Sequence, residues 1–549
     1  MDFRGLTGET IRADVVAGIA LAALLIPEGM AYAGIAGVPP QAGLFAAAVG
    51  LFVYALCGSS RHLAVSATSG SAAMLAALVA PLAQGDAAKY SLLASATAIA
   101  VGILLLLGAV LKLGFVSEFI SKPVLKGFVF GLAMTIMVKQ APKLLGIKKG
   151  SGDFWDQMEH LIRSIDQTHL WTLGVGAAAL AITFGLGAIA PRIPSALVVF
   201  VGGILAAKYM GLEQHGVEVV GTMQGGMPHL VWPMAGRPEW WELLTGGVGI
   251  VLIMYAEALA AARTFAAKYR YEISPNQELA ALGVSNLCSG VLQGFVVGGG
   301  MSGTAANAAG GARTQLSTMT TSVLTILTLG FLTPLFHDLP EAVLGAIVIH
   351  AVAHLADVGE LKRFARLKTG SIWVSLTALA GVLTFGILKG LVLAVVLTLI
   401  ALMKKLTTPN ESVLGRLAST GTFVDINRYP EAQPVPGVLI VRPNAILFFA
   451  NANRFFNRLR QLMKEQGEAL RAVILNFEAV SELDVTTLDL LEQLRGDLAA
   501  SGIRLCLARV PDPVKELLGI SGFSERLGEN NQFWRTELAV EACEGKASG

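Results

Sequence analysis

Two short motifs of small and hydroxyl-bearing residues recur far apart in the chain. Residues 69–73 read SGSAA and residues 302–306 read SGTAA, and a Pro/Gln/Leu element precedes each of them, at residues 40–44 and 275–279. Paired, glycine-interrupted segments at corresponding positions of two halves are the best sequence indication of a transporter's substrate site. A packing seam between two helices uses the same residue types, but a seam seldom recurs together with its flanking elements. The motifs therefore predict a binding site formed by two related halves.

Two carboxyl groups lie inside apolar stretches. Glu257 follows the run IVLIMYA at residues 250–256, and Glu28 follows Pro27 in the first apolar segment. An ionisable group within a membrane segment is costly, so it indicates a functional site by default. Two other interpretations stay open: Glu257 could hydrogen-bond a neighbouring helix, and Glu28 could support a helix break after Pro27.

The composition indicates a membrane protein. Of the 549 residues, 54% are hydrophobic and only 15% are charged, and the mean hydropathy is +0.62. Soluble domains carry about 25% charged residues, so we predict a polytopic membrane protein. The net charge of +2 gives no reason to expect a nucleic-acid partner. The four cysteines have neither disulfide nor metal-site spacing. We interpret the first apolar run as a membrane helix and not as a signal peptide.

About fourteen apolar segments can be compared with the roughly 20 residues that a helix needs to cross a bilayer. They lie near residues 12–36, 40–57, 69–84, 91–113, 116–145, 171–191, 193–211, 242–266, 276–296, 302–310, 314–336, 339–357, 369–388 and 390–405. The two short segments, 69–84 and 302–310, begin at the two motifs and are predicted to be half-helices that start inside the membrane. Irregular backbone at that depth is tolerated only where it is buried or lines a cavity.

Lys and Arg residues fall mainly in alternate loops between these segments. Because positively charged loops stay inside, this pattern predicts that both termini are cytoplasmic, although the loop at residues 139–163 is basic on the opposite side. An even number of spans is consistent with two inverted repeats of seven, at about residues 12–211 and 242–405. Residues 1–406 are therefore expected to form an all-α polytopic membrane domain.

The composition changes after Lys405. Residues 407–435 are polar and contain several prolines, so we interpret them as a linker, and residues 436–545 are predicted to form a small α/β domain. Its expected strands are 438–441, 446–449, 472–476 and 504–508, and its expected helices are 453–466, 486–501 and 511–518. Asp484 or Thr486 is expected to cap the second of these helices. Phosphorylation of Thr486 or Thr487 is the alternative.

Four stretches, in this order, carry a resemblance to a known family. They are PEGMAYA at residues 27–33, GVPPQAGLF at 37–45, NQELAALG at 276–283 and SGTAAN at 302–307. Together with a C-terminal domain that resembles a STAS domain, they make nearly the whole chain similar to the SulP anion transporters, the bacterial relatives of the solute-carrier-26 exchangers and prestin. The resemblance implies a homodimer in the bacterial inner membrane, with core and gate domains built from the repeats. It also implies that one anion is held between the short third and tenth helices.

Two half-helices that meet N-terminus to N-terminus suit an anion. Each offers free N–H groups and about half a positive charge, so no charged side chain is needed. The expected substrate-binding residues are Ser69, Gly70, Ser302, Gly303 and Thr304, with Tyr32 and Phe45 as walls, and with Gln41 and its repeat counterpart Gln277 supporting the half-helices. An aromatic residue in a membrane helix is nevertheless more often a packing residue.

The resemblance also places an acidic residue of the eighth helix, which is Glu257 here, beside the anion. An acid near a bound anion is useful only if it is protonated or paired with a cation. Many family members carry Arg where this chain has Gly303. Because a fixed positive charge is missing, the charge balance moves toward a co-bound proton or Na⁺. We therefore expect Glu257 and Glu28 to serve the coupling ion.

The predicted function is secondary active transport of a small inorganic or carboxylate anion, of the sulfate, bicarbonate, chloride, nitrate or dicarboxylate class. Transport is expected to proceed by alternating access and to be coupled to H⁺ or Na⁺. The alternative is an uncoupled anion channel, or an anion-dependent sensor with a regulatory output through the STAS domain. That domain could also bind a cytoplasmic partner. The sequence contains no recognisable nucleophile–base pair or phosphate-binding loop, so we expect no enzyme activity, no cofactor and no metal site.

Overall fold

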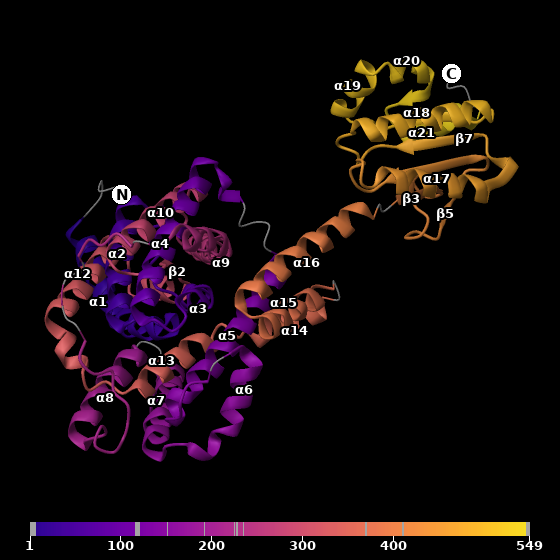
Figure 1. Ribbon diagram of the computed structural model, residues 1–549. Coiled ribbons are helices and arrows are strands. Elements are labelled where there is room, and N and C mark those ends of the chain that lie inside the picture. The colour runs from indigo at the N-terminus through magenta and orange to yellow at the C-terminus, as the bar shows by residue number, and fades with distance from the viewer. Residues whose placement is uncertain are drawn as a thin grey trace. The chain divides into compact units, whose positions relative to one another are not determined.

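The computed structural model describes residues 7–115, 121–150, 152–190, 193–223, 226, 229–233, 235–367, 370–408 and 411–544. The chain divides into two compact units, Met1–Thr398 and Leu399–Gly549, whose elements are labelled in Figure 1. The first unit is almost entirely helical, and the second combines a sheet with helices.

The first half of the helical unit contains eight helices and one very short strand. They are α1 (Gly8–Ala36), α2 (Pro40–Cys57), β1 (Val65–Ser66), α3 (Ser69–Ala83), α4 (Ala87–Val110), α5 (Lys122–Leu145), α6 (Phe154–Arg163), α7 (Leu170–Ile189) and α8 (Ser195–Met210). The second half repeats this order with α9 (Arg237–Tyr269), α10 (Pro275–Val291), β2 (Gly298–Gly299), α11 (Met301–Ala309), α12 (Leu316–Leu327), α13 (Glu341–Ala353), α14 (Val358–Arg366), α15 (Ser371–Phe385) and α16 (Ile387–Thr407).

The two halves match element by element. Each has a long first helix, a strand of two residues before its third helix, and a short helix, α6 or α14, before its last two. Each of the predicted apolar segments coincides with a helix, although residues 116–120 of the fifth segment lie outside the described residues. Among the helices of the described ranges, nine are long and apolar enough to cross a membrane. The predicted half-helices α3 and α11 are short, with 15 and 9 residues.

Helix α1 runs through Pro27 without interruption, so the structure does not contain the helix break that was one interpretation of Glu28. Proline removes one backbone hydrogen bond, and membrane helices tolerate this loss where neighbouring helices pack around them. Helix α2 packs very closely against α1 just after this point. A Cβ atom on Gly43 would lie 2.0 Å from the carbonyl oxygen of Gly29. This close approach fixes α1 next to Glu28.

The second unit is built on one mixed sheet. Strands β6 (Val438–Pro443), β7 (Ala472–Asn476), β8 (Arg504–Ala508) and β9 (Gln532–Phe533) pair in parallel in that order. Helices α17 (Ala452–Gln466), α18 (Val485–Ala500), α19 (Asp512–Ile520) and α20 (Phe523–Leu527) share one apolar cluster with the sheet. Helix α21 (Thr536–Glu544) packs into the other cluster, so the sheet is covered on both faces.

The stretch at residues 407–435 differs from the linker that we expected. It contains β3 (Glu411–Leu417), β4 (Phe423–Asp425) and β5 (Ala432–Gln433), and β3 pairs antiparallel with β6. Its Leu414 is buried in the apolar cluster of the sheet. The strand expected at 446–449 is also wrong, because only Leu447 forms an isolated bridge there, to Leu483. The turn that follows β6 leaves too few residues for a ladder.

The boundary of the second unit can be tested by truncation. We expect a fragment of residues 408–549 to be soluble and to unfold cooperatively, and a fragment of residues 435–549 to be less stable by at least about 3 kcal/mol. The shorter fragment loses the buried Leu414, a class of loss that costs about 2–5 kcal/mol, and it exposes the edge of β6. Urea unfolding of the two fragments measures the difference, and equal stabilities would restore the linker interpretation.

Asp484 caps helix α18, as one interpretation of the sequence predicted. Its Oδ1 accepts hydrogen bonds from the Thr487 N–H at 2.8 Å and from the Thr487 hydroxyl at 2.6 Å. Partial desolvation acts to raise the pKa of Asp484, but these hydrogen bonds hold it below its usual value. Thr487 is fully buried and Thr486 is exposed. Of the two threonines, only Thr486 is open to modification.

Candidate anion-binding site

A short ladder between the two halves brings the half-helices together. Strands β1 and β2 pair antiparallel, with Val65 opposite Gly299 and Ser66 opposite Gly298. Helix α3 begins three residues after β1 and helix α11 begins two residues after β2. Because equivalent segments of the two repeats pair antiparallel, a local twofold axis relates them. The N-termini of α3 and α11 therefore meet at this ladder.

Buried side chains fix the backbone on both sides of the ladder. Asn286 on α10 accepts a hydrogen bond from the Val297 N–H at 3.0 Å and donates one to the Val297 carbonyl at 2.8 Å. The Thr304 hydroxyl donates to the carbonyl of Gly300 at 2.6 Å and accepts from the Ala64 N–H at 3.3 Å. The Thr304 hydroxyl, which we expected to bind substrate, is thus engaged with the backbone and positions the two half-helices.

The starts of both half-helices present backbone donors. The first N–H groups of an α-helix have no acceptor within the helix. In α3, the Thr68 hydroxyl accepts a hydrogen bond from the Ser71 N–H at 3.2 Å, and the N–H groups of Ser69 and Gly70 precede this capped position. In α11, the N-cap residue is Gly300, which has no side chain that could act as a cap. Both helix starts can therefore donate to an anion.

Each half-helix start faces a carboxyl group from the opposite repeat. Glu28 on α1 lies close enough to the hydroxyls of Tyr32 and Ser302 to interact with both. Both carboxylate oxygens of Glu257 on α9 lie 3.5 Å from the place that a Cβ atom on Gly70 would occupy. The first repeat thus supplies the acid beside α11, and the second repeat supplies the acid beside α3. We call this arrangement the crossed acid pair, Glu28 and Glu257.

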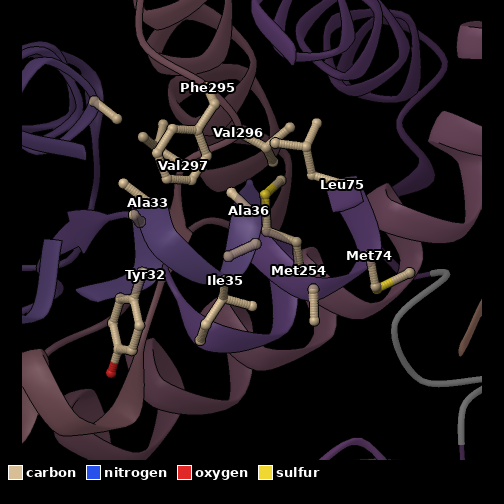
Figure 2. Close-up of a cluster of buried hydrophobic side chains, with 14 of the residues drawn as sticks. Tyr32, Ala33, Ile35, Ala36, Met74, Leu75, Met254, Phe295, Val296 and Val297 are labelled. Carbon is tan, nitrogen blue, oxygen red and sulfur yellow. The ribbon is translucent and has the colours of Figure 1, made fainter. Parts of the chain in front are cut away.

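Tyr32 lies close to both acids. Its side chain is 6% exposed and is close enough to Glu28 and Glu257 to interact electrostatically with both. In Figure 2, the Tyr32 hydroxyl points away from the other labelled side chains, which include Phe295 and Val297 on the segment that leads into β2. The position suits a residue that walls the site and offers it one hydroxyl group.

The motif residues differ in what they face. Ser302 is exposed and Ser69 is buried at the start of its helix. Gly303 faces packed apolar side chains, because a Cβ atom there would lie 3.3 Å from Leu25 and 3.5 Å from Ala64. A larger side chain at position 303 would have to extend past Leu25 and Ala64 before it could reach the half-helix starts.

The structure separates Gln41 from the ladder. Gln41 lies in the first turn of α2, nine residues before Gly50, which packs against β1, and nine helical residues span about 13 Å. Its repeat counterpart Gln277 donates a hydrogen bond to the carbonyl of Cys57 at 3.0 Å, at the end of α2. Phe45 is 8% exposed and packs in the main apolar core.

Glu278 is a structural acid that was not among the predicted residues. Its carboxylate accepts hydrogen bonds from the Tyr54 hydroxyl at 2.7 Å, the Ser59 N–H at 2.9 Å, the Ser59 hydroxyl at 2.6 Å and the Ser60 N–H at 3.2 Å. The side chain is 1% exposed. Its place in the repeated Pro/Gln/Leu element was the available signal. It fixes α10 to the loop that leads into β1.

Asp14 is a second such acid. It is fully buried, and it accepts hydrogen bonds from the Arg313 N–H at 2.6 Å, the Thr314 N–H at 3.1 Å and the Thr314 hydroxyl at 2.6 Å. It ties α1 to the loop between α11 and α12. A carboxyl group within the first apolar segment was its only signal in the sequence.

Two family models match this chain. The model of the sulfate permease family matches residues 11–378, and the model of the STAS domain matches residues 429–539. This chain belongs to the sulfate permease family. Among its relatives in this family, a probable sulfate transporter of Mycobacterium tuberculosis is 34% identical over 542 residues, which cover 99% of this chain and 97% of the relative. Sulfate transporter 1.2 of Arabidopsis thaliana is 30% identical over 577 residues, which cover 99% and 87%.

Solved structures show the same sulfate permease fold. Murine Solute Carrier 26 family member A9, an anion transporter in the inward-facing state, superposes with a TM-score of 0.91 at 20% identity and covers 99% of this chain and 93% of its own. The transmembrane domain of a cyanobacterial bicarbonate transporter, BicA, gives a TM-score of 0.62 at 22% identity and covers 72% of this chain and 98% of its own. The expected fold class, a helical multi-pass membrane domain followed by a STAS domain, is confirmed.

Proposed function

We propose that this protein is a secondary active transporter of a small inorganic or carboxylate anion, coupled to protons, with Na⁺ as the second candidate ion. The anion binds between the starts of α3 and α11. The observation that carries the proposal is the crossed acid pair, because each acid lies beside a helix N-terminus, which is where an anion would bind.

The acids and the anion compete for the same positive charge. A carboxylate near a helix N-terminus is stabilised by the helix dipole, so an ionised Glu28 or Glu257 takes up the charge that attracts the substrate. An anion beside two carboxylates in a poorly screened site is repelled. Binding is favourable once protons, or a cation, neutralise the acids. Substrate and coupling ion therefore enter the site together.

Sulfate is the first substrate to test, because two relatives are named as sulfate transporters. Bicarbonate, chloride, nitrate and dicarboxylates belong to the same proposed class, since helix dipoles and small side chains recognise charge better than shape. We further propose a homodimer in a bacterial inner membrane with both termini in the cytoplasm.

Uptake into proteoliposomes tests the function. Labelled sulfate is offered with an inward proton gradient, with an inward Na⁺ gradient, or with neither. Accumulation above equilibrium under one gradient is expected and excludes a channel. Equilibration at the same level in all three conditions would instead support the uncoupled channel.

Ser302→Leu should abolish anion binding. The change removes a hydroxyl group from the start of α11 and places a bulky apolar side chain beside Glu28. We expect the increase in melting temperature that anions cause in the purified wild type to disappear, and uptake to fall at least about tenfold. Ala309→Leu is the matched control, because it adds a comparable side chain to an exposed position at the far end of α11. Wild-type binding by Ser302→Leu would remove α11 from the site.

A further inference from the structure

A group of lysines at the end of α5 contradicts the charge pattern of the other loops. The loop at residues 139–163 is basic on the side that the Lys/Arg pattern assigns to the outside. Within the described residues, Lys143 forms an ion pair of 2.6 Å with Glu341 at the start of α13. Lys149 interacts electrostatically with Lys143 and Glu341, and Lys139 interacts with Lys149 and with Asp153.

This lysine cluster, Lys139, Lys143 and Lys149, lies near the candidate site. The Lys143 ammonium is 3.3 Å from the place that a Cβ atom on Gly34 would occupy. Gly34 is on α1, six residues after Glu28, so it lies about 9 Å farther along the helix axis. From Glu28, this direction leads toward the end of α1 that is proposed to be outside. The cluster therefore lies beside the helix that carries the first acid, on its outer side.

The lysine cluster carries an excess of positive charge. Three ammonium groups face two carboxylates, Asp153 and Glu341, so one positive charge is in excess. Lys139 and Lys143 lie in the last two turns of α5, and the exposed Lys149 lies in the loop that follows. Partial desolvation and the nearby Lys143 lower the pKa of Lys149. An anion would relieve this imbalance.

We propose that Lys139, Lys143 and Lys149 form an outer anion site, which captures the transported anion before it reaches the starts of α3 and α11. This inference rests on the proposed function and on the proposed orientation of the chain. A positive entrance raises the local concentration of an anionic substrate and its rate of association, by an amount that falls with ionic strength.

Lys149→Gln tests the outer site. We expect the KM for external sulfate to rise about tenfold, at the lower end of what electrostatic steering contributes, with kcat nearly unchanged. The decline of uptake with added salt should become shallower, and the KM for sulfate offered from inside should not change. Lys149→Arg keeps the charge and should restore wild-type values. Lys148→Gln is the matched control, because it removes one positive charge from the exposed neighbouring residue, which is outside the proposed cluster.

Each outcome has a separate meaning. If wild type transports sulfate but Lys149→Gln keeps its KM and salt dependence, the outer site is overturned and the proposed function stands. A lower kcat with an unchanged KM would assign Lys149 to helix packing, and a change on the inner side alone would place the cluster on the wrong face. If wild type carries none of sulfate, bicarbonate, chloride, nitrate and a dicarboxylate in parallel assays, the proposed function itself fails. Melting temperatures equal to that of the wild type show that the variants are folded.

Discussion

Glu257→Gln is expected to keep anion exchange and to lose concentrative uptake driven by a proton gradient. Glutamine has the shape of the protonated acid, so Gly70 and the start of α3 keep a neutral neighbour and the anion still binds. The amide cannot release a proton, so the anion cycle is no longer linked to the gradient. One pH unit is worth about 1.36 kcal/mol, so a gradient of that size can support about tenfold accumulation in wild type with one proton per anion.

The measurement is sulfate accumulation in proteoliposomes as a function of the imposed pH gradient, compared with exchange at equal pH. Glu242→Gln is the control, because Glu242 lies on the same helix α9 but is exposed. If Glu257→Gln still accumulated the anion with an undiminished response to pH, and Na⁺ had no effect, Glu257 would be a packing residue. A response of the wild type to Na⁺ alone would make Na⁺ the coupling ion.

Glu278→Ala should destabilise the membrane unit by about 3 kcal/mol or more. The change leaves the donors on Tyr54, Ser59 and Ser60 without their buried acceptor, and a hydrogen bond to a charged group contributes about 1.5–3 kcal/mol. Because this contact fixes the loop before β1, the ladder that joins the half-helices should loosen as well. We expect a lower melting temperature in detergent together with weaker anion binding.

Two further variants test this interpretation. Glu272→Ala removes an exposed acid six residues earlier and should melt like wild type. Tyr54→Phe removes one of the donors to Glu278 and should have an intermediate effect. A melting temperature for Glu278→Ala within experimental error of the wild type would show that the network does not stabilise the fold.

The sequence was informative wherever a local pattern determines the structure. Length and hydropathy located the helices, and the breaks before Ser69 and Ser302 located the half-helices, because small residues and an apolar run are visible within a short window. The order of the strands and helices from residue 436 to 518 followed from alternation and amphipathicity, apart from the strand expected at 446–449, whereas α20, β9 and α21 were not predicted. These signals depend on neighbours in the chain.

Contacts between distant segments could not be predicted in the same way. Glu28 meets Ser302 across 274 residues, and no local pattern encodes such a contact. The Thr304 hydroxyl looked free because its acceptor, a backbone carbonyl, has no side-chain signature. The strand β3 was hidden because its sequence, ESVLGRL, is short, is interrupted by Gly415 and follows Pro409 closely. Its identity as a strand comes from pairing with β6.

The crossed acid pair also bears on how such a chain could have arisen by duplication. A single ancestral repeat would contain one acid and one half-helix that do not face each other. Each of them would need its partner from a second copy of the repeat. Two copies inserted in opposite membrane orientations would each supply the partner that the other copy lacks. Two copies inserted in the same orientation would leave both acids without a half-helix. Joining two oppositely inserted copies in one chain would therefore make this pairing permanent.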